Sequence, residues 1–239
     1  MNTREKRRHE RVRWTFLLLF SLLFSSSALK KNNSENHLEG IHITEEISHM
    51  VTIKPDALIS KNDVKIDTVH IYLNPSVQTW NAYINQLGTE AQHMNKIAEI
   101  MYSMLKQYSF IQVDANLNYL SLANSVAESN QKSRDIHLAL HSNAGGGSGL
   151  ETFQKKNDGF GQYLHNQLMN SLPFPSRGVK DGNHLYEIKN AKAKHVVLME
   201  ILFHDNLKEA KYIVTHHEEI ATKLTNALVN YIVDNYAKK

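Results

Sequence analysis

The chain has 239 residues, 41% of them hydrophobic, and it contains no cysteine. This size suits one well-buried domain with a modest extension, and the lack of cysteine excludes disulfides, thiolate metal sites and thiol nucleophiles. Residues 1–13 carry a net charge of +4, so the formal charge of +3 leaves −1 for the other 226 residues. The composition therefore excludes the broad basic field that is typical of nucleic-acid binding.

The N-terminus has the pattern of an export signal. Six lysines and arginines in residues 1–13 precede 16 uncharged residues with the apolar core FLLLFSLLF, and small residues follow near Ala28. This uncharged stretch is shorter than the ~20 residues that a membrane-spanning helix needs. We predict a cleavable signal peptide over residues 1–28, with an uncleaved membrane anchor or tether as the alternative. Either segment predicts a protein that works outside the cytoplasmic membrane, in the extracellular space or the cell wall.

Residues 29–66 form a polar, weakly periodic stretch with one short β-like run at residues 51–53, before Pro55. We interpret this stretch as a linker or arm, with at most one edge strand. Regular patterns begin directly after it. The predicted folded domain therefore spans residues 67–239.

Apolar patterns within this domain alternate between the periods of strands and of helices. In chain order they predict a strand over 68–73, a helix over 89–108, a strand over 110–114, a helix over 117–129, strands over 135–141 and 150–153, a helix over 160–172, a strand over 195–203, and helices over 206–215 and 218–236. Alternating strands and helices predict the α/β class: a single domain whose mostly parallel, twisted sheet is flanked by helices on both faces.

The segment DIHLALHSNAGGG places His137 and His141 four residues apart. On a helix, two histidines at this spacing could share one zinc ion. The strict alternation of the segment instead indicates a strand, on which they would lie about 13 Å apart, too far for one ion. Because ligands bind at the carboxyl ends of strands in open α/β sheets, His141 is the better candidate for a metal ligand.

Two glutamates are further candidates for chemistry. Glu200 lies within the apolar run HVVLMEILF, where a carboxylate is costly to bury unless it is paired or bound to a metal. The alternative is a strand-end carboxylate that reaches solvent or a basic partner. Glu90 begins the helix after the first strand, and it fits equally well as an acid favoured by the helix dipole.

Five segments in this order carry a family resemblance: IYLNPS (71–76), GTE (88–90), DIHLALHSNAG (135–145), GLETF (149–153) and VVLMEILFHDN (196–206). Together they resemble the type 3 family of zinc-dependent N-acetylmuramoyl-L-alanine amidases, and most closely a divergent branch of Gram-positive bacteria and their phages. The resemblance covers about residues 68–236. It implies a hydrolase that uses Zn²⁺ to cut the amide between the muramic acid lactyl group and L-alanine in peptidoglycan.

The resemblance also implies roles for single residues. Glu90 and His141 correspond to zinc ligands, and Glu200 corresponds to the catalytic carboxylate that takes a proton from water and delivers it to the departing amine. Most of the family begins with a D-P-G-H-like turn whose histidine is the first ligand, whereas residues 74–78 here read NPSVQ. The amide oxygen of Gln78 is the candidate replacement, although it is a weaker zinc ligand than imidazole.

Other residues remain candidates beside this set. His93, one turn after Glu90, is an alternative ligand. Asn143 and the glycines that follow it are expected to border the peptide groove. His204 is a candidate substrate contact. Tyr186 is another, with packing of a loop aromatic on the domain as the alternative.

Two further function classes stay open. The missing first histidine is compatible with a catalytically degenerate amidase-fold protein that only binds the cell wall, and the same scaffold could serve a zinc peptidase of another specificity. The retention of Glu200 in a buried strand favours the enzyme, because a pure binder has little use for that acid. The expected partner is peptidoglycan; no protein partner is evident.

Overall fold

The structure is a computed structural model that describes residues 65–238. The predicted export segment and nearly all of the predicted linker lie outside these residues, so both stay predictions. Within residues 65–238, no helix is long and apolar enough to cross a membrane.

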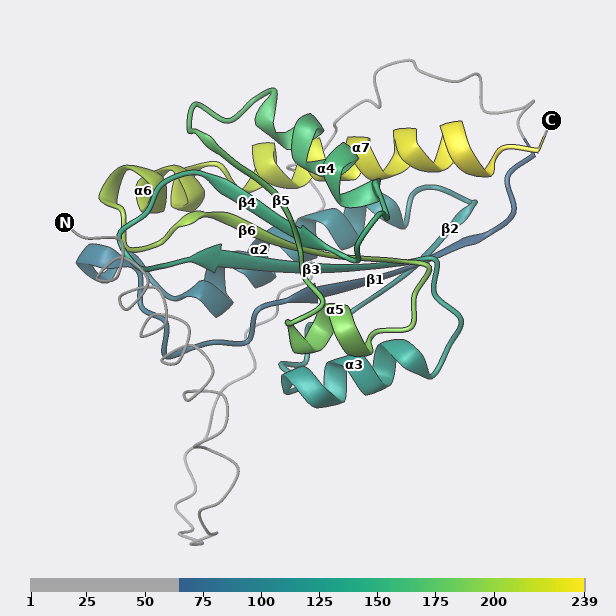
Figure 1. Cartoon of the computed structure of the whole chain (residues 1–239), viewed down its shortest axis with the longest axis horizontal. Helices are drawn as coiled ribbons and strands as arrows, with labels where there is room; N and C mark the ends of the chain where they lie inside the picture. The colour runs from purple at the N-terminus through teal and green to yellow at the C-terminus, as the bar shows by residue number, and fades with distance from the viewer. Residues whose placement is uncertain (1–64, 239) are drawn as a thin grey trace, which may run out of the picture. The chain divides into compact units, whose positions relative to one another are not determined.

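Six strands form one sheet in the order β2-β1-β3-β6-β4-β5 (Figure 1). Their bounds are β1 Val69–Pro75, β2 Ile111–Ala115, β3 Ile136–Asn143, β4 Leu150–Gln154, β5 Ser176–Asp181 and β6 His195–Phe203. Strands β2, β1, β3 and β6 run parallel to one another, whereas β4 pairs antiparallel with β6 and parallel with β5. The predicted mostly parallel sheet is confirmed.

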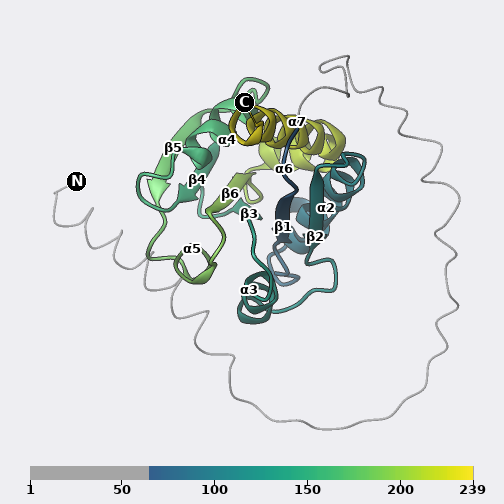
Figure 2. The same cartoon turned by 90° about the vertical axis from the view of Figure 1, so that its right-hand side faces the viewer.

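Helices cover both faces of this sheet, as expected. The helices are η2 Ile84–Gln86 (a 3₁₀ turn), α2 Glu90–Leu105, α3 Leu122–Asn130, α4 Phe160–Met169, α5 Tyr186–Asn190, α6 Leu207–Thr215 and α7 His217–Tyr236. Figure 2 shows α2, α4 and α7 on one side of the strands and α3 and α5 on the other. The site described below lies where the parallel strands end, beside the start of α2.

The two faces of the sheet differ in the apolar surface that they bury. On the α2 and α7 face, alternate residues of β3 such as Leu138 and Leu140 belong to the large hydrophobic core. On the α3 and α5 face, Ala139 belongs to a much smaller apolar cluster, and His137 beside it is fully buried. Since a buried polar group needs hydrogen-bond partners, this second face is where a polar network is expected.

The largest differences from the predicted elements have local causes. Helix α3 begins at Leu122 rather than at residue 117, because the Asn116 side chain accepts a hydrogen bond from the Leu120 N–H at 2.8 Å and Tyr119 has φ = +56°. Strand β5 and helix α5 were not predicted. Strand β5 has no buried residue and so lacks an apolar alternation, and α5 is only five residues long.

The end of β6 contains a bulge beside the site. The register passes from His141 opposite Glu200 to Asn143 opposite Phe203, so β6 has one extra residue. Leu202 within it has φ = +59°, a left-handed conformation that costs a leucine about 1–3 kcal/mol. The bulge lets the Phe203 N–H donate to Glu209 Oε2 at 2.7 Å instead of continuing the ladder.

Candidate active site

Glu90 is the first residue of α2, but it does not cap that helix. Thr89 is the N-cap, and it exchanges hydrogen bonds with Gln92 in a capping box. The Glu90 side chain is therefore free to turn away from the helix end, and it is only 1% exposed. A carboxylate buried this deeply needs polar partners.

Those partners are His141 and Asn81. His141 Nδ1 lies 2.9 Å from Glu90 Oε1, and the Asn81 side-chain amide donates to Glu90 Oε2 at 2.7 Å. Burial alone would raise the pKa of Glu90, but these contacts hold it below its ordinary value. Burial likewise opposes the charged form of His141, yet Glu90 raises the pKa of His141 to about 9. The two side chains thus form a complementary pair.

Gln78 completes a cluster with this pair. Its Nε2 lies 3.5 Å from His141 Nδ1, and its Oε1 accepts a hydrogen bond from the same Asn81 amide at 2.9 Å. A half-turn of the Gln78 amide exchanges its oxygen and nitrogen, so either atom can face the pair. Three side chains from three separate segments therefore converge on one point.

The spacing of this cluster fits a small metal ion. Two tetrahedral ligands at 2.0–2.1 Å from zinc lie roughly 3.3 Å apart, and the distances of 2.9 Å and 3.5 Å around His141 Nδ1 bracket that value. No group of three or more histidines, cysteines, aspartates or glutamates suited to a metal occurs in residues 65–238. A metal held here would accordingly have one carboxylate, one imidazole and one neutral amide from the protein.

Glu200 lies directly beside this cluster in the sheet. It is opposite His141 on β3 and opposite Glu151 on β4. These three side chains therefore form a row across three strands, on the face of the sheet that α5 covers. Glu151 is neutralised by Lys180 and by Arg177, whose Nε lies 3.4 Å from it. Glu200 Oε2 is buried, and within the described part of the chain it has no hydrogen-bond partner.

This environment changes how Glu200 titrates. Burial raises its pKa to about 7; Glu90 and Glu151 add to the effect, and His141 opposes it. Both the carboxylate and the carboxylic acid are therefore well populated near neutral pH. A group of this kind can accept a proton and return it, as general acid-base catalysis requires.

The three expected substrate contacts have different surroundings. Asn143, at the end of β3, donates to Glu151 Oε2 at 3.1 Å. Tyr186, the first residue of α5, is 48% exposed. His204 differs from the expectation because it is only 5% exposed, and its Nδ1 lies 3.0 Å from both oxygens of Ser142. It contacts the end of β3 through Ser142.

The alternative histidines lie away from the cluster. His93 contacts the Leu87 carbonyl at 2.6 Å and His217 at 3.0 Å, so it does not turn towards Glu90. His137 is buried and has Ser129 Oγ at 2.8 Å and Glu187 Oε1 at 2.7 Å, so it is an internally hydrogen-bonded residue.

Three residues of the site were not predicted from the sequence. Glu151 shares the strand face of Glu200, and its place in LETF was the one available signal. Asn81 holds Gln78 and Glu90 together from an irregular loop, which has no periodicity to read. Glu187 lies in the unpredicted helix α5 and reaches within 4.0 Å of His141.

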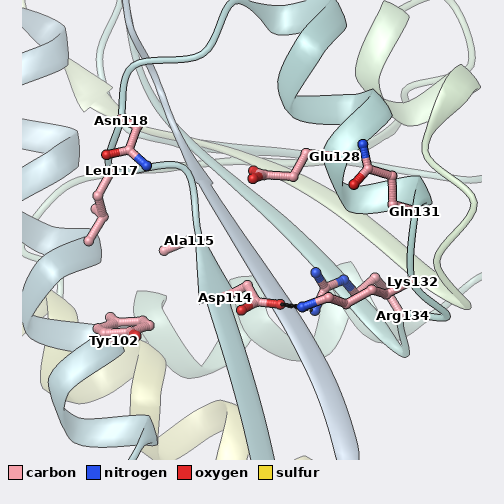
Figure 3. Close-up of a pocket in the computed structure, with 9 residues that line it drawn as sticks. All are labelled: Tyr102, Asp114, Ala115, Leu117, Asn118, Glu128, Gln131, Lys132 and Arg134. Atoms are coloured by element: carbon pink, nitrogen blue, oxygen red, sulfur yellow. Dashed lines mark hydrogen bonds and ion pairs between the residues drawn. The ribbon is translucent and has the colours of Figure 1, made fainter.

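A separate pocket of about 490 Å³ lies near the end of β2 (Figure 3). Its lining is Tyr102, Asp114, Ala115, Leu117, Asn118, Glu128, Gln131, Lys132 and Arg134. Asp114 Oδ2 pairs with Arg134 at 2.6 Å and with Lys132 at 3.0 Å. The pocket contains none of the predicted site residues, and its acidic and basic groups are balanced.

Several solved structures share this fold. An N-acetylmuramoyl-L-alanine amidase from Clostridium difficile 630 is 19% identical, with a TM-score of 0.61, over 71% of this chain and 99% of that one. The catalytic domain of an amidase from Bacillus (Paenibacillus) polymyxa var. colistinus is 18% identical, with a TM-score of 0.63, over 69% and 98%. An amidase of Nostoc punctiforme is 12% identical, with a TM-score of 0.63, over 70% and 99%.

A family model identifies the chain at the level of sequence. A comparison with curated protein sequences finds no match. The model of the family described as N-acetylmuramoyl-L-alanine amidase matches residues 66–230, which is well over half of the chain and includes the whole Gln78, Glu90, His141 and Glu200 cluster. The chain therefore belongs to the N-acetylmuramoyl-L-alanine amidase family.

Proposed function

We propose that this protein hydrolyses the amide between the muramic acid lactyl group and L-alanine in peptidoglycan, with Glu200 as its catalytic carboxylate. The observation that carries this proposal is the juxtaposition of Glu200, whose buried Oε2 has no hydrogen-bond partner in residues 65–238, with the cluster of Glu90, His141 and Gln78. Family membership supports the reaction class. The site geometry supports the roles of these residues.

Glu90, His141 and Gln78 are the proposed ligands of a zinc ion. Glu90 and His141 are donors that zinc commonly takes, and the 2.9 Å between His141 Nδ1 and Glu90 Oε1 is close to the spacing around one tetrahedral ion. Gln78 would present its oxygen at the position that its Nε2 holds, 3.5 Å from His141 Nδ1. When bound, zinc supplies a Lewis acid that polarises the scissile carbonyl and lowers the pKa of a water molecule to about 7. Asn81 fixes the Glu90 carboxylate by donating to its Oε2, whereas Gln78 would exchange its hydrogen bond from Asn81 for the metal when its amide turns.

Glu200 is the proposed carrier of the proton. As a carboxylate it accepts a proton from the attacking water, and as a carboxylic acid it delivers that proton to the departing L-alanine amine. Burial keeps its pKa near 7, where both forms exist. The neighbouring Glu151 cannot share this role, because Lys180 and Arg177 hold it in an ion pair.

The glycine-rich loop after β3 is the proposed edge of the peptide groove. Asp205 accepts hydrogen bonds from the Gly145 and Gly146 N–H groups at 2.6 Å and 2.8 Å. Buried Glu209 accepts from the Gly149 N–H at 3.0 Å. Gly149 has φ = +100°, and a Cβ there would lie 2.0 Å from the Pro175 carbonyl. The loop is thus held rigidly, with Asn143 at its start and Tyr186 as the second proposed contact.

Export completes the proposal. The family acts on the cell wall, and residues 1–28 have the pattern of a signal that carries the domain to it. Whether that segment is cleaved or kept as a membrane tether decides if the enzyme is free or surface-bound.

The competing view is a degenerate wall-binding protein, and one experiment separates it from the enzyme. The full-length chain in mild detergent is incubated with peptidoglycan, alone, with a chelator, and with zinc added after the chelator. We expect newly freed L-alanine amino groups that the chelator abolishes and zinc restores. Binding to peptidoglycan without any release would support the degenerate protein instead.

A further inference from the structure

A buried polar network lies directly behind the proposed metal site, between the sheet and α5. Its centre is Glu187, which is 2% exposed. Glu187 Oε1 lies 2.7 Å from His137 Nε2 and also accepts a hydrogen bond from the Asn74 side-chain amide. Its other oxygen, Oε2, lies 4.0 Å from His141 Nε2. The carboxylate therefore stands between two histidines of the same strand.

The surrounding residues hold this carboxylate in one orientation. Because a carboxylate can only accept, His137 Nε2 donates to Glu187, and His137 Nδ1 lies 2.8 Å from the Ser129 hydroxyl, which holds the other edge of the ring. The Asn116 amide donates to Asn74 Oδ1 at 3.1 Å, which fixes the amide that binds Glu187. All five residues of this hydrogen-bond network are buried, namely Asn74, Asn116, Ser129, His137 and Glu187.

The network also keeps Glu187 charged. Its Oε1 accepts hydrogen bonds from His137 and Asn74, and such bonds favour the charged form of a carboxylate. A fixed negative charge consequently faces the Nε2 edge of the His141 ring. At 4.0 Å the contact is electrostatic, and in this buried setting it is little screened by solvent.

The two edges of the His141 ring thus meet two different carboxylates. Nδ1 faces Glu90 and Gln78, and Nε2 faces Glu187. The lone-pair directions of the two ring nitrogens diverge widely, so one ion cannot touch both edges. Glu187 is therefore not a candidate for the ligand set itself.

We propose that Glu187 is a positioning residue for His141: when the metal replaces the proton that Nδ1 directs at Glu90, the charge of Glu187 holds the remaining ring proton on Nε2 and so leaves the Nδ1 lone pair for the metal. This inference rests on the proposed zinc site and deepens it. A carboxylate behind a metal-binding histidine fixes the tautomer and raises the basicity of the ligand. Such support matters more here, because the neutral amide of Gln78 makes the proposed ligand set weaker than one with a second imidazole.

The test measures zinc affinity by competition with a chromophoric chelator, using the full-length chain in mild detergent. Glu187→Gln keeps the size of the side chain but removes its charge. We expect its zinc affinity to fall by about 10-fold or more, the usual range for losing such a partner. Glu128→Gln is the matched control. Glu128 accepts a hydrogen bond from Tyr72 on the same side of the sheet, and within residues 65–238 no hydrogen bond or ion pair joins it to His141. Glu128→Gln should therefore bind zinc like the wild type.

A second measurement needs no variant of Glu187, so it holds even where that variant does not fold. In nitrogen-15 spectra of the zinc-loaded wild-type chain, with the His141 signals assigned by comparison with His141→Asn, we expect a metal-bound Nδ1 and a protonated Nε2. A metal-bound Nε2 would overturn the inference.

The outcomes separate this inference from the proposed function. Folded Glu187→Gln with wild-type zinc affinity would overturn the positioning role and leave the zinc site intact. A wild-type chain that binds no zinc would overturn both. Loss of affinity in Glu187→Gln, together with wild-type affinity in Glu128→Gln, would establish the role.

Discussion

Glu200 lies directly opposite His141 in the β3–β6 register, one strand away from the point where Glu90 and Gln78 converge. The imidazole of His141, a side chain that commonly binds metals, thus lies next to Glu200, a carboxylate whose pKa is raised. The reaction class of the family needs both, and neighbouring strands bring them together although they lie far apart in the sequence.

The replacement of the usual first histidine leads to a prediction about metal affinity. Gln78→His should strengthen zinc binding, because imidazole is a better zinc ligand than an amide oxygen. Gln78→Ala should weaken it by about 10-fold, a loss of about 1.4 kcal/mol. Both are measured by chelator competition, and wild-type affinity in Gln78→Ala would show that Gln78 does not contact the metal.

Glu90 should matter for metal rather than for helix stability. Since Thr89 and Gln92 already cap α2, the effects of Glu90→Gln should come from its site contacts. We expect tight zinc binding to be abolished and the metal-free chain to lose about 1.5–3 kcal/mol of stability with the charged contact to His141. Thr89→Ala is the converse control, with a loss of about 1 kcal/mol of stability and unchanged zinc binding. Wild-type zinc affinity in folded Glu90→Gln would contradict the role of Glu90 as a ligand.

The carboxylate of Glu209 should contribute strongly to stability. It is fully buried and accepts hydrogen bonds from the Ser148 hydroxyl and from the Gly149 and Phe203 N–H groups. Glu209→Gln is expected to lose about 1.5–3 kcal/mol, because hydrogen bonds to charged groups are the strong ones. Urea unfolding measures the loss, and Glu99→Gln, on the exposed side of α2, should stay within about 0.5 kcal/mol of the wild type.

The His93 and His217 contact predicts a pH dependence of stability. Burial lowers the pKa of His217 from 6.5 to about 4, and His93 and Lys96 add to this shift. Between these pH values the unfolded chain binds the proton and the folded chain does not, so stability rises with pH and is fully present above 6.5. The difference in unfolding free energy between the wild type and His217→Asn should grow from pH 4 to 6.5. A constant difference would refute this assignment.

Much of the fold was predictable because its central elements have clear periods. The runs that became β3 and β6 are almost entirely buried, and a continuous apolar run of that length is typical of a parallel strand. Strand β5 escaped prediction because neither of its faces is buried, and its sequence, SRGVKD, carries no period. The predicted start of α3 was wrong, because the hydrogen bond that the Asn116 side chain accepts from the Leu120 N–H delays the start of this helix.

The residues of the site likewise divide into those that the sequence pattern identifies and those that only the three-dimensional structure reveals. Glu200 stood out because a charge within an apolar strand demands an explanation, and His141 stood out by its place at a strand end. Glu187 and Asn81 could not be found in this way. Their importance comes only from three-dimensional contacts with His137, His141 and Glu90, and no local pattern records such contacts.

The most direct test of the central claim compares Glu200→Gln with the wild type in two measurements on the same samples, namely zinc content and release of L-alanine amino groups from peptidoglycan. The variant is expected to fold and bind zinc like the wild type, because Glu200 is a proton carrier and not a ligand in the proposed site. Its turnover should fall by about 10²–10⁴-fold, the usual contribution of a general acid-base group. Wild-type turnover in zinc-loaded Glu200→Gln would contradict the proposed mechanism.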